Sequence, residues 1–222
     1  MSFYCVVNVR LSLTHTNEEQ NNIRNDIFHD MLQDTNMITV TQIDYANWQI
    51  VRREYDDIYS VCIRLMDQLS LHNQTCVMGI GIGSISTNES KDSRRMDGEA
   101  FILARESIEL ATLNQKNYSK NIPTKKCNIH LLISSTLDPK HELASMVNQL
   151  IQNNEVLRSK ITSKQWETIR LYEQYGSYDK LIANDPNMKK GTLSDKMNKS
   201  NYWMMKKNEK LVEEILVKLS QR

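Results

Sequence analysis

The sequence predicts an α+β protein with a ferredoxin-like or palm-type antiparallel sheet, helices on one face of it, and then an all-α helix-turn-helix domain. Residues 3–85 alternate strand and helix patterns in the order β-α-β-β-α-β, which is the split βαβ arrangement. From residue 162 onward, helix patterns follow one another with turn residues between them. We therefore divide the chain into residues 1–154 and residues 155–222.

Each element has its own local pattern. Residues 3–11 are β-branched and aromatic and predict a strand, and residues 17–33 carry apolar side chains at helical spacing, with Thr16 or Asn17 as the cap. Residues 44–47 predict a hairpin between two strands. The remaining predicted elements are strands at 37–43, 48–53, 75–85 and 125–135, and helices at 56–71, 97–115 and 141–153.

The composition is that of an ordinary globular protein, with 40% hydrophobic and 25% charged residues among 222. No apolar run approaches the roughly 18–20 residues that span a bilayer, and the N-terminus lacks the features of a secretory signal. We therefore expect a cytoplasmic protein without a membrane partner.

Cysteine and histidine spacing argues against a metal site. The four cysteines, Cys5, Cys62, Cys76 and Cys127, form no CxxC pair, and the five histidines form no HxxxH pair. We expect reduced, mostly buried thiols, and neither a metal nor a cofactor.

The C-terminal segment carries several helix-boundary signals. Thr162 with Gln165 forms a capping box, and Gly176 ends that helix where a left-handed residue is favoured. Ser177 caps a short second helix, which must end before Pro186. Thr192 then opens a third helix, and a longer helix follows through residue 219. Helix, glycine turn, short helix, turn and helix are the plan of a helix-turn-helix.

The charge of this segment favours an anionic partner. Residues 155–222 hold 14 lysines and arginines against 9 acidic residues, a net charge of +5, in a chain whose total is +1. We predict duplex DNA as the partner and a homodimer as the binding form. The negative charge of Asp195, on the helix face presumed to contact DNA, argues against this prediction. The alternative is a helical bundle used only for dimerisation. The predicted DNA contacts are Lys189, Lys190, Thr192, Ser194, Asn198 and Lys199.

The stretch "VMGIGIGSIST" places Gly79, Gly81 and Gly83 at every second position of a strand. Alternate residues share one face, so this face is bare and allows a helix or a ligand to approach closely. The sequence contains neither GxxxxGK nor GxGxxG here. The pattern favours close helix packing over ligand binding.

The stretch "GIGIGSISTNESKDSRRMDGEAFILARESI" resembles the signature of the SatD family, G-I-G-x-I-x-T followed by D-G-x-A-x-x-x-A-R. The matching residues are Gly81, Ile82, Gly83, Ile85, Thr87, Asp97, Gly98, Ala100, Ala104 and Arg105. The resemblance extends over most of the chain, because SatD-like proteins also end in a helix-turn-helix. It implies an N-terminal domain related to the palm of nucleotidyl cyclases and a DNA-binding C-terminus.

The chain departs from that family at the places where a palm holds metal ions. The first strand, around Val9, contains no acid, and the hairpin "TQIDYANWQ" keeps only Asp44. One carboxylate cannot build a two-metal site, so we expect no catalytic residues and a degenerate palm that serves as a sensor or dimerisation module.

Two other functions stay open. One is a nucleotide-binding or nucleotide-processing enzyme that uses Gly81, Gly83, Asp97, Gly98 and Arg105, with a phosphate at a helix N-terminus. The structural account of the same residues has Asp97 as a helix cap and Arg105 paired with it or with another acid. The other is a protein whose helices bind only a protein partner.

Overall fold

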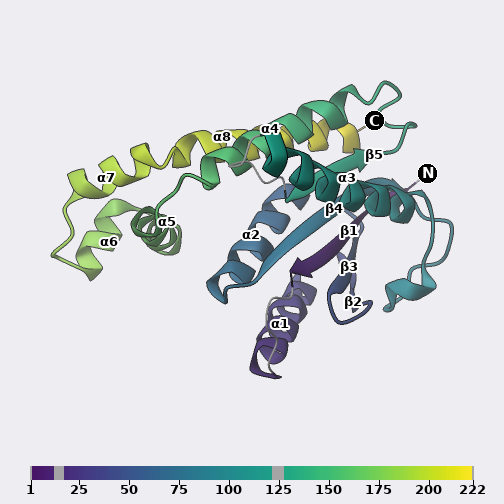
Figure 1. Ribbon diagram of the computed structural model, residues 1–222, viewed down its shortest axis with the longest axis horizontal. Helices are drawn as coiled ribbons and strands as arrows, with labels where there is room; N and C mark the ends of the chain where they lie inside the picture. The colour runs from purple at the N-terminus through teal and green to yellow at the C-terminus, as the bar shows by residue number, and fades with distance from the viewer. Residues whose placement is uncertain (1, 13–17, 122–127, 222) are drawn as a thin grey trace.

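The computed structural model describes residues 2–12, 18–121 and 128–221. Within them the strands are β1 (Phe3–Ser12), β2 (Met37–Gln42), β3 (Asn47–Arg52), β4 (Thr75–Ser84) and β5 (Ile129–Ile133). The helices are α1 (Glu18–Asp30), α2 (Ile58–Leu71), α3 (Glu99–Asn121), α4 (Glu142–Arg158), α5 (Ser163–Tyr175), α6 (Tyr178–Asn184), α7 (Lys190–Lys199) and α8 (Tyr202–Ser220), with short 3-10 turns η1 (Met31–Gln33) and η2 (Ser93–Arg95). Figure 1 shows the sheet at one end of the molecule and α5, α6 and α7 at the other.

The five strands form one sheet in the order β2-β3-β1-β4-β5. β1 pairs antiparallel with both β3 and β4, and β2 pairs antiparallel with β3, which is the ferredoxin-like order of the first four strands. The predicted α+β class is therefore confirmed. The sheet is nevertheless mixed, because β5 pairs in parallel with β4. A helical crossover, here α3, returns the chain to the starting end of the sheet and makes the neighbouring strand parallel.

Helices cover both faces of the sheet, whereas the sequence predicted helices on one face. α1 and α2 share a buried cluster with one face of β4, which carries Met78, Ile80 and Ile82. α3 lies on the other face, where Ala100 and Ala104 pack with residues of β1 and β3. Both faces of β4 are apolar or bare, and such a strand has to be covered on each side.

α8 returns from the three-helix end of the molecule to the main core. Val212, Ile215, Leu216 and Leu219 belong to the same buried cluster as β1, β4, α2 and α4. α8 runs alongside α4 (Figure 1), and Asn154 of α4 donates a hydrogen bond to the carbonyl oxygen of Met205 at 3.1 Å. The predicted boundary after residue 154 thus lies inside α4, and α8 completes the core of the preceding part.

Most element predictions differ from the structure only at the ends. The predicted caps of α1, Thr16 and Asn17, lie outside the described residues. The prediction that Thr192 opens a helix is wrong, because α7 begins at Lys190 and its first helical hydrogen bond joins Leu193 N–H to Lys189 O at 3.1 Å.

Within the described ranges, no helix has both the length and the apolar character needed to cross a membrane.

The cysteines that the structure describes are buried free thiols, as predicted. Cys5, Cys62 and Cys76 have no disulfide partner, and Cys127 lies outside the described residues. Burial raises the pKa of Cys62 to about 12. These thiols therefore stay protonated and unreactive near neutral pH.

Candidate nucleic-acid interface and arginine groove

The predicted boundary residues form both ends of α5 and the start of α6. Thr162 and Gln165 form a reciprocal capping box at the start of α5, in which Gln165 Oε1 accepts from Thr162 N–H at 2.9 Å. Gly176 ends α5 in the left-handed region at φ 74°, and Ser177 Oγ accepts from Lys180 N–H at 3.3 Å to cap α6. Each of these capping contacts joins residues only three apart, so the local sequence specifies these helix ends.

α5, α6 and α7 enclose a small core of their own. Ile169 of α5 and Met197 of α7 are buried together with Tyr202 and Met205 at the start of α8. Leu181 of α6 and Leu193 of α7 are buried as well. The stripe of α7 that carries Leu193 and Met197 is therefore the packed one, and the opposite side of that helix is left exposed.

Most of the predicted DNA contacts are exposed on α7 or directly before it. Lys189, Lys190, Thr192, Asn198 and Lys199 are all exposed. Ser194 differs, because it is half-buried and its hydroxyl hydrogen-bonds to Tyr178. Five of the six predicted residues are therefore exposed on α7 or directly before it, whereas Ser194 is turned toward Tyr178 of α6.

Two of these lysines are held by weak surface ion pairs. Lys190 Nζ lies 2.9 Å from Asp179 Oδ1, and Lys199 Nζ lies 2.8 Å from Asp195 Oδ2. All four side chains are more than half exposed, and such pairs contribute about 0–1 kcal/mol. Among the described residues, no carboxylate lies within 4 Å of Lys189. A phosphate can displace these partners at little cost.

A groove of about 710 Å³ lies between α3, η2 and the neighbouring face of β1 and β3. Its size is typical of a small-molecule site. Four arginines line it, together with three side-chain amides and two carboxylates. The set, which we call the arginine groove, comprises Arg10, Arg94, Arg95, Arg105, Asn8, Asn47, Gln49, Asp44 and Asp97.

Two of the four arginines are neutralised by partners outside the groove. Arg10 pairs with Glu109 at 2.9 Å, and Arg94 pairs with Asp92 at 2.9 Å. Within the described part of the chain, neither Arg95 nor Arg105 has a carboxylate within 4 Å. The groove therefore offers two unpaired guanidinium groups to an anion.

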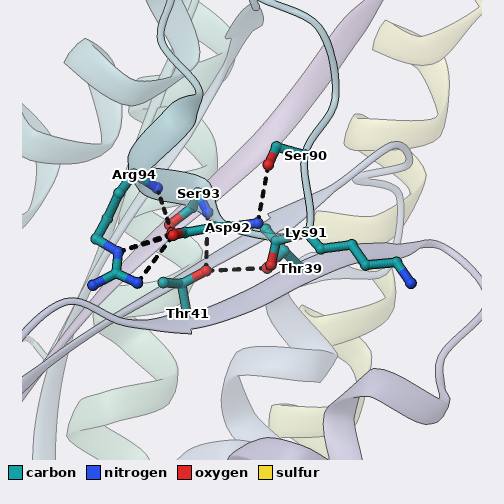
Figure 2. Close-up of polar contacts among 7 residues, drawn as sticks. All are labelled: Thr39, Thr41, Ser90, Lys91, Asp92, Ser93 and Arg94. Carbon is teal, nitrogen blue, oxygen red and sulfur yellow. Dashed lines mark hydrogen bonds and ion pairs between the residues drawn. The ribbon is translucent and has the colours of Figure 1, made fainter.

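The loop that carries Arg94 and Arg95 is fixed to the edge strand β2. Thr39 Oγ1 donates to the carbonyl oxygen of Lys91 at 2.7 Å, and Ser93 N–H donates to Thr41 Oγ1 at 3.0 Å. Figure 2 shows these contacts and the Arg94 side chain folded back onto Asp92. The loop is therefore held by buried hydroxyl groups, which sets the position of η2 at the rim of the groove.

The residues predicted for nucleotide binding do not all meet at this groove. Asp97 and Arg105 line it, whereas Gly81 and Gly83 lie beneath α3. A Cβ atom on Gly81 would lie 2.3 Å from both Ala100 O and Ala104 N. The packing interpretation of the glycine strand is therefore confirmed: the bare face is filled by the backbone of α3.

The predicted capping role of Asp97 is wrong. α3 begins at Glu99, and the carbonyl oxygen of Gly98 accepts from Phe101 N–H at 3.1 Å. Asp97 Oδ1 accepts only from the adjacent Gly98 N–H, at 2.8 Å, among the described residues. Gly98 has φ +144°, which side chains rarely adopt, so glycine is needed at this turn. Nor does any described carboxylate lie within 4 Å of Arg105.

Asp44, the remaining acid of the presumed palm hairpin, is occupied by its own turn. Its Oδ1 accepts from Ala46 N–H at 2.8 Å and from Asn47 N–H at 2.9 Å. The Asn47 side chain also donates to this carboxylate, and these hydrogen bonds hold the Asp44 pKa below its ordinary value. Among the described residues, no three His, Cys, Asp or Glu side chains are grouped as a metal site requires.

Sequence reasoning missed Arg10, Arg94 and Arg95. Arg10 and Asn8 alternate on β1 with the core residues Val7 and Val9, which places both polar side chains on the α3 side of the sheet. The arginine pair "RR" stands directly before Met96 and Asp97 in the sequence. The alternation on β1 and the arginine pair were the available signals in the sequence. That Arg10 lies near Arg94 and Arg95 depends on how the loop folds back onto the sheet.

Comparisons with family models, curated proteins and solved structures gave no match to this chain. The resemblance to the SatD family therefore stays a prediction from the quoted motif.

Proposed function

We propose that the protein is a SatD-like cytoplasmic regulator that binds duplex DNA as a homodimer, with α7 in the major groove. The sheet-containing part, a degenerate palm, serves as sensor or dimerisation module. The observation that carries the proposal is the set of exposed lysines at both ends of α7, in a three-helix unit (α5, α6 and α7) whose first two helices have side-chain caps. Lys189 and Lys190 contact phosphates, and Asn198 and Lys199 reach base edges.

The geometry of α7 supports this assignment at its N-terminus as well. Lys189 flanks the helix without a side-chain cap, and Gly191 has no atom within 4 Å of its potential Cβ position. The first N–H groups of a helix are unpaired and favour a phosphate. Two lysines at this end add positive charge to the same place.

The test is binding of the full-length protein to a labelled mixed-sequence duplex, followed by fluorescence anisotropy at about 50 and 200 mM salt. We expect Lys190→Ala combined with Lys199→Ala to weaken binding and to reduce the salt slope by about 0.9, since Lys190 is the phosphate contact of the pair and each lost phosphate contact lowers the slope by about that much. Substitutions are preferable to deleting residues 155–222, because α8 belongs to the main core.

The matched control is Lys140→Ala combined with Lys218→Ala. It removes the same charge from two exposed lysines, one before α4 and one in the last turn of α8. DNA affinity and salt slope should stay those of the natural protein. If the α7 variant also leaves both unchanged, the proposed interface is wrong.

A second candidate function is binding of a nucleotide in the arginine groove. The favouring observation is the pair of unpaired arginines, Arg95 and Arg105, in a groove that also carries amides able to contact a base. We expect ATP with magnesium to raise the melting temperature by about 2 °C or more if it binds well below its added concentration. Arg105→Ala should abolish the shift and Lys140→Ala should not. A shift that survives in Arg105→Ala excludes this site.

A further inference from the structure

A second cavity lies between the sheet-containing part and the three-helix unit. This cleft, of about 750 Å³, has α2 as one wall and α5 as the other, with Arg158 of α4 between them. We call it the α2–α5 cleft and define it by Arg64, Asp67, Leu71, Arg158, Trp166 and Arg170.

The cleft carries unbalanced positive charge. Arg64 on α2 and Arg170 on α5 are exposed, and no described carboxylate lies within 4 Å of either. The acids of the cleft are already engaged: Asp67 forms an ion pair with Arg158, and Glu173 lies 3.2 Å from Lys206 Nζ. One guanidinium on each wall is therefore left for a ligand's anionic group.

The cleft also has an apolar surface. Leu71 at the end of α2 is 53% exposed, and Trp166 of α5 is half-buried. The guanidinium carbon of Arg158 lies over one face of the Trp166 ring, 4.6 Å from its centre. Apolar contact area next to guanidinium groups fits a molecule that is both planar and negatively charged.

Arg158 joins the two walls. It pairs with Asp67 on α2 and lies over one face of Trp166 on α5, so one side chain links the sheet-containing part to the three-helix unit. Burial raises the pKa of Asp67, while the charge of Arg158 opposes that rise. A ligand in contact with both walls would restrict how α5, and with it α7, is placed.

We propose that the α2–α5 cleft binds a small aromatic anion, held by Arg64 and Arg170 and packed on Leu71 and Trp166. The binding itself is independent of the proposed DNA interface. Its consequence for DNA, a changed affinity of α7 when the cleft is filled, rests on the proposed function.

The test uses 8-anilinonaphthalene-1-sulfonate as the probe for the full-length protein, with energy transfer from tryptophan as the signal. We expect saturable binding, and a dissociation constant at least about tenfold higher in Arg64→Gln combined with Arg170→Gln, since charge-assisted hydrogen bonds contribute about 1.5–3 kcal/mol. Lys140→Gln combined with Lys218→Gln removes the same charge from two exposed lysines outside this cleft and should leave binding unchanged. N-phenyl-1-naphthylamine, the same ring system without sulfonate, should bind equally to all three proteins.

Two outcomes overturn the proposal. One is sulfonate-probe affinity that is the same in the Arg64/Arg170 variant and the natural protein. The other is loss of DNA affinity in that variant without any probe, which would assign these arginines to the DNA interface. If no DNA binding is found at all while the probe results hold, the cleft stands and the proposed function fails.

Discussion

At the scale of single residues, Glu155 is the carboxyl group with the most strongly raised pKa among the described residues. It is buried where α4 meets the start of β5, and its Oε2 accepts from Asn128 N–H and from the Asn128 side chain, both at 3.0 Å. Burial raises the Glu155 pKa to about 7, against the opposing effects of these hydrogen bonds and of Arg158. Glu155 therefore keeps its proton at pH values where an exposed glutamate is charged.

This perturbation predicts a specific pH dependence of stability. The folded pKa lies above the ordinary 4.5, so the contribution of Glu155 is fully present below pH 4.5 and is lost as the pH rises to about 7. The loss amounts to about 3 kcal/mol. Glu155→Gln keeps an acceptor for Asn128 and removes the titration. As the pH rises over this range, the unfolding free energy of the variant should therefore increase relative to that of the natural protein.

The measurement is urea unfolding of both proteins at pH values from 4.5 to 8. The comparison cancels the other titrating groups, among them Asp67 and Glu209, whose pKa values burial also raises. Parallel stability curves for the two proteins would show that Glu155 titrates alike in the folded and unfolded chains.

At the scale of elements, β4 and α3 pack backbone against backbone at the glycine strand. Gly81 faces the backbone of α3, where a methyl group would lie 2.3 Å from two backbone atoms. We expect Gly81→Ala to cost about 3 kcal/mol or more, because helix and sheet must separate to admit it. Thermal unfolding followed by circular dichroism measures this loss.

Gly191→Ala is the matched control. Gly191 lies in the first turn of α7, and nothing is within 4 Å of its potential Cβ position. There the added methyl group should stabilise by about 0.5 kcal/mol, since alanine is the better helix former. A Gly81→Ala protein as stable as the natural one would mean that α3 does not sit on β4 as described.

The same elements show what the sequence could predict. The alternating glycines leave one face of β4 without side chains, and Ala100 and Ala104 give α3 a face with only methyl groups. The close packing of β4 and α3 therefore follows from local pattern. The capping box at Thr162 and the glycine end at Gly176 are local too. These features are decided within one or two turns of chain, where spacing determines geometry.

What the sequence could not predict depends on distant contacts. The parallel pairing of β5 with β4 and the return of α8 to the core require knowing which apolar stripe packs against which. The arginine groove needs Arg10 on β1 and Arg95 in η2, which are brought together only by the docking of the loop on Thr39 and Thr41. The start of α7 at Lys190 overrides the capping preference of Thr192.

At the scale of the whole molecule, α8 joins the three-helix unit to the main core. Leu216 is fully buried among residues of the sheet and α2, whereas Leu211 on the same helix is 41% exposed. We expect Leu216→Ala to lower the unfolding free energy by about 2–5 kcal/mol, and Leu211→Ala to change it by less than about 0.5 kcal/mol.

The readout for this pair is fluorescence of Trp48 in a background that carries Trp166→Phe and Trp203→Phe. Trp48 is buried and stacked on Phe28 at 4.2 Å between ring centroids, far from α8 in the chain. Because α8 completes the common core, Trp48 should report the loss in Leu216→Ala at the same urea concentration as helical circular dichroism. A Trp48 transition that is unmoved by Leu216→Ala would show that α8 folds apart from the sheet.

The return of α8 also has a consequence for synthesis. On the ribosome, β1, β4, α2 and α4 emerge before Val212 and Leu219, so the nascent chain carries an uncovered apolar patch while residues 159–201 are being made. Such transiently exposed surface is where aggregation begins and where chaperones bind. The helices α5, α6 and α7, which rest on local signals, can form during that interval, and the earlier part of the chain reaches its final state only after α8 has emerged.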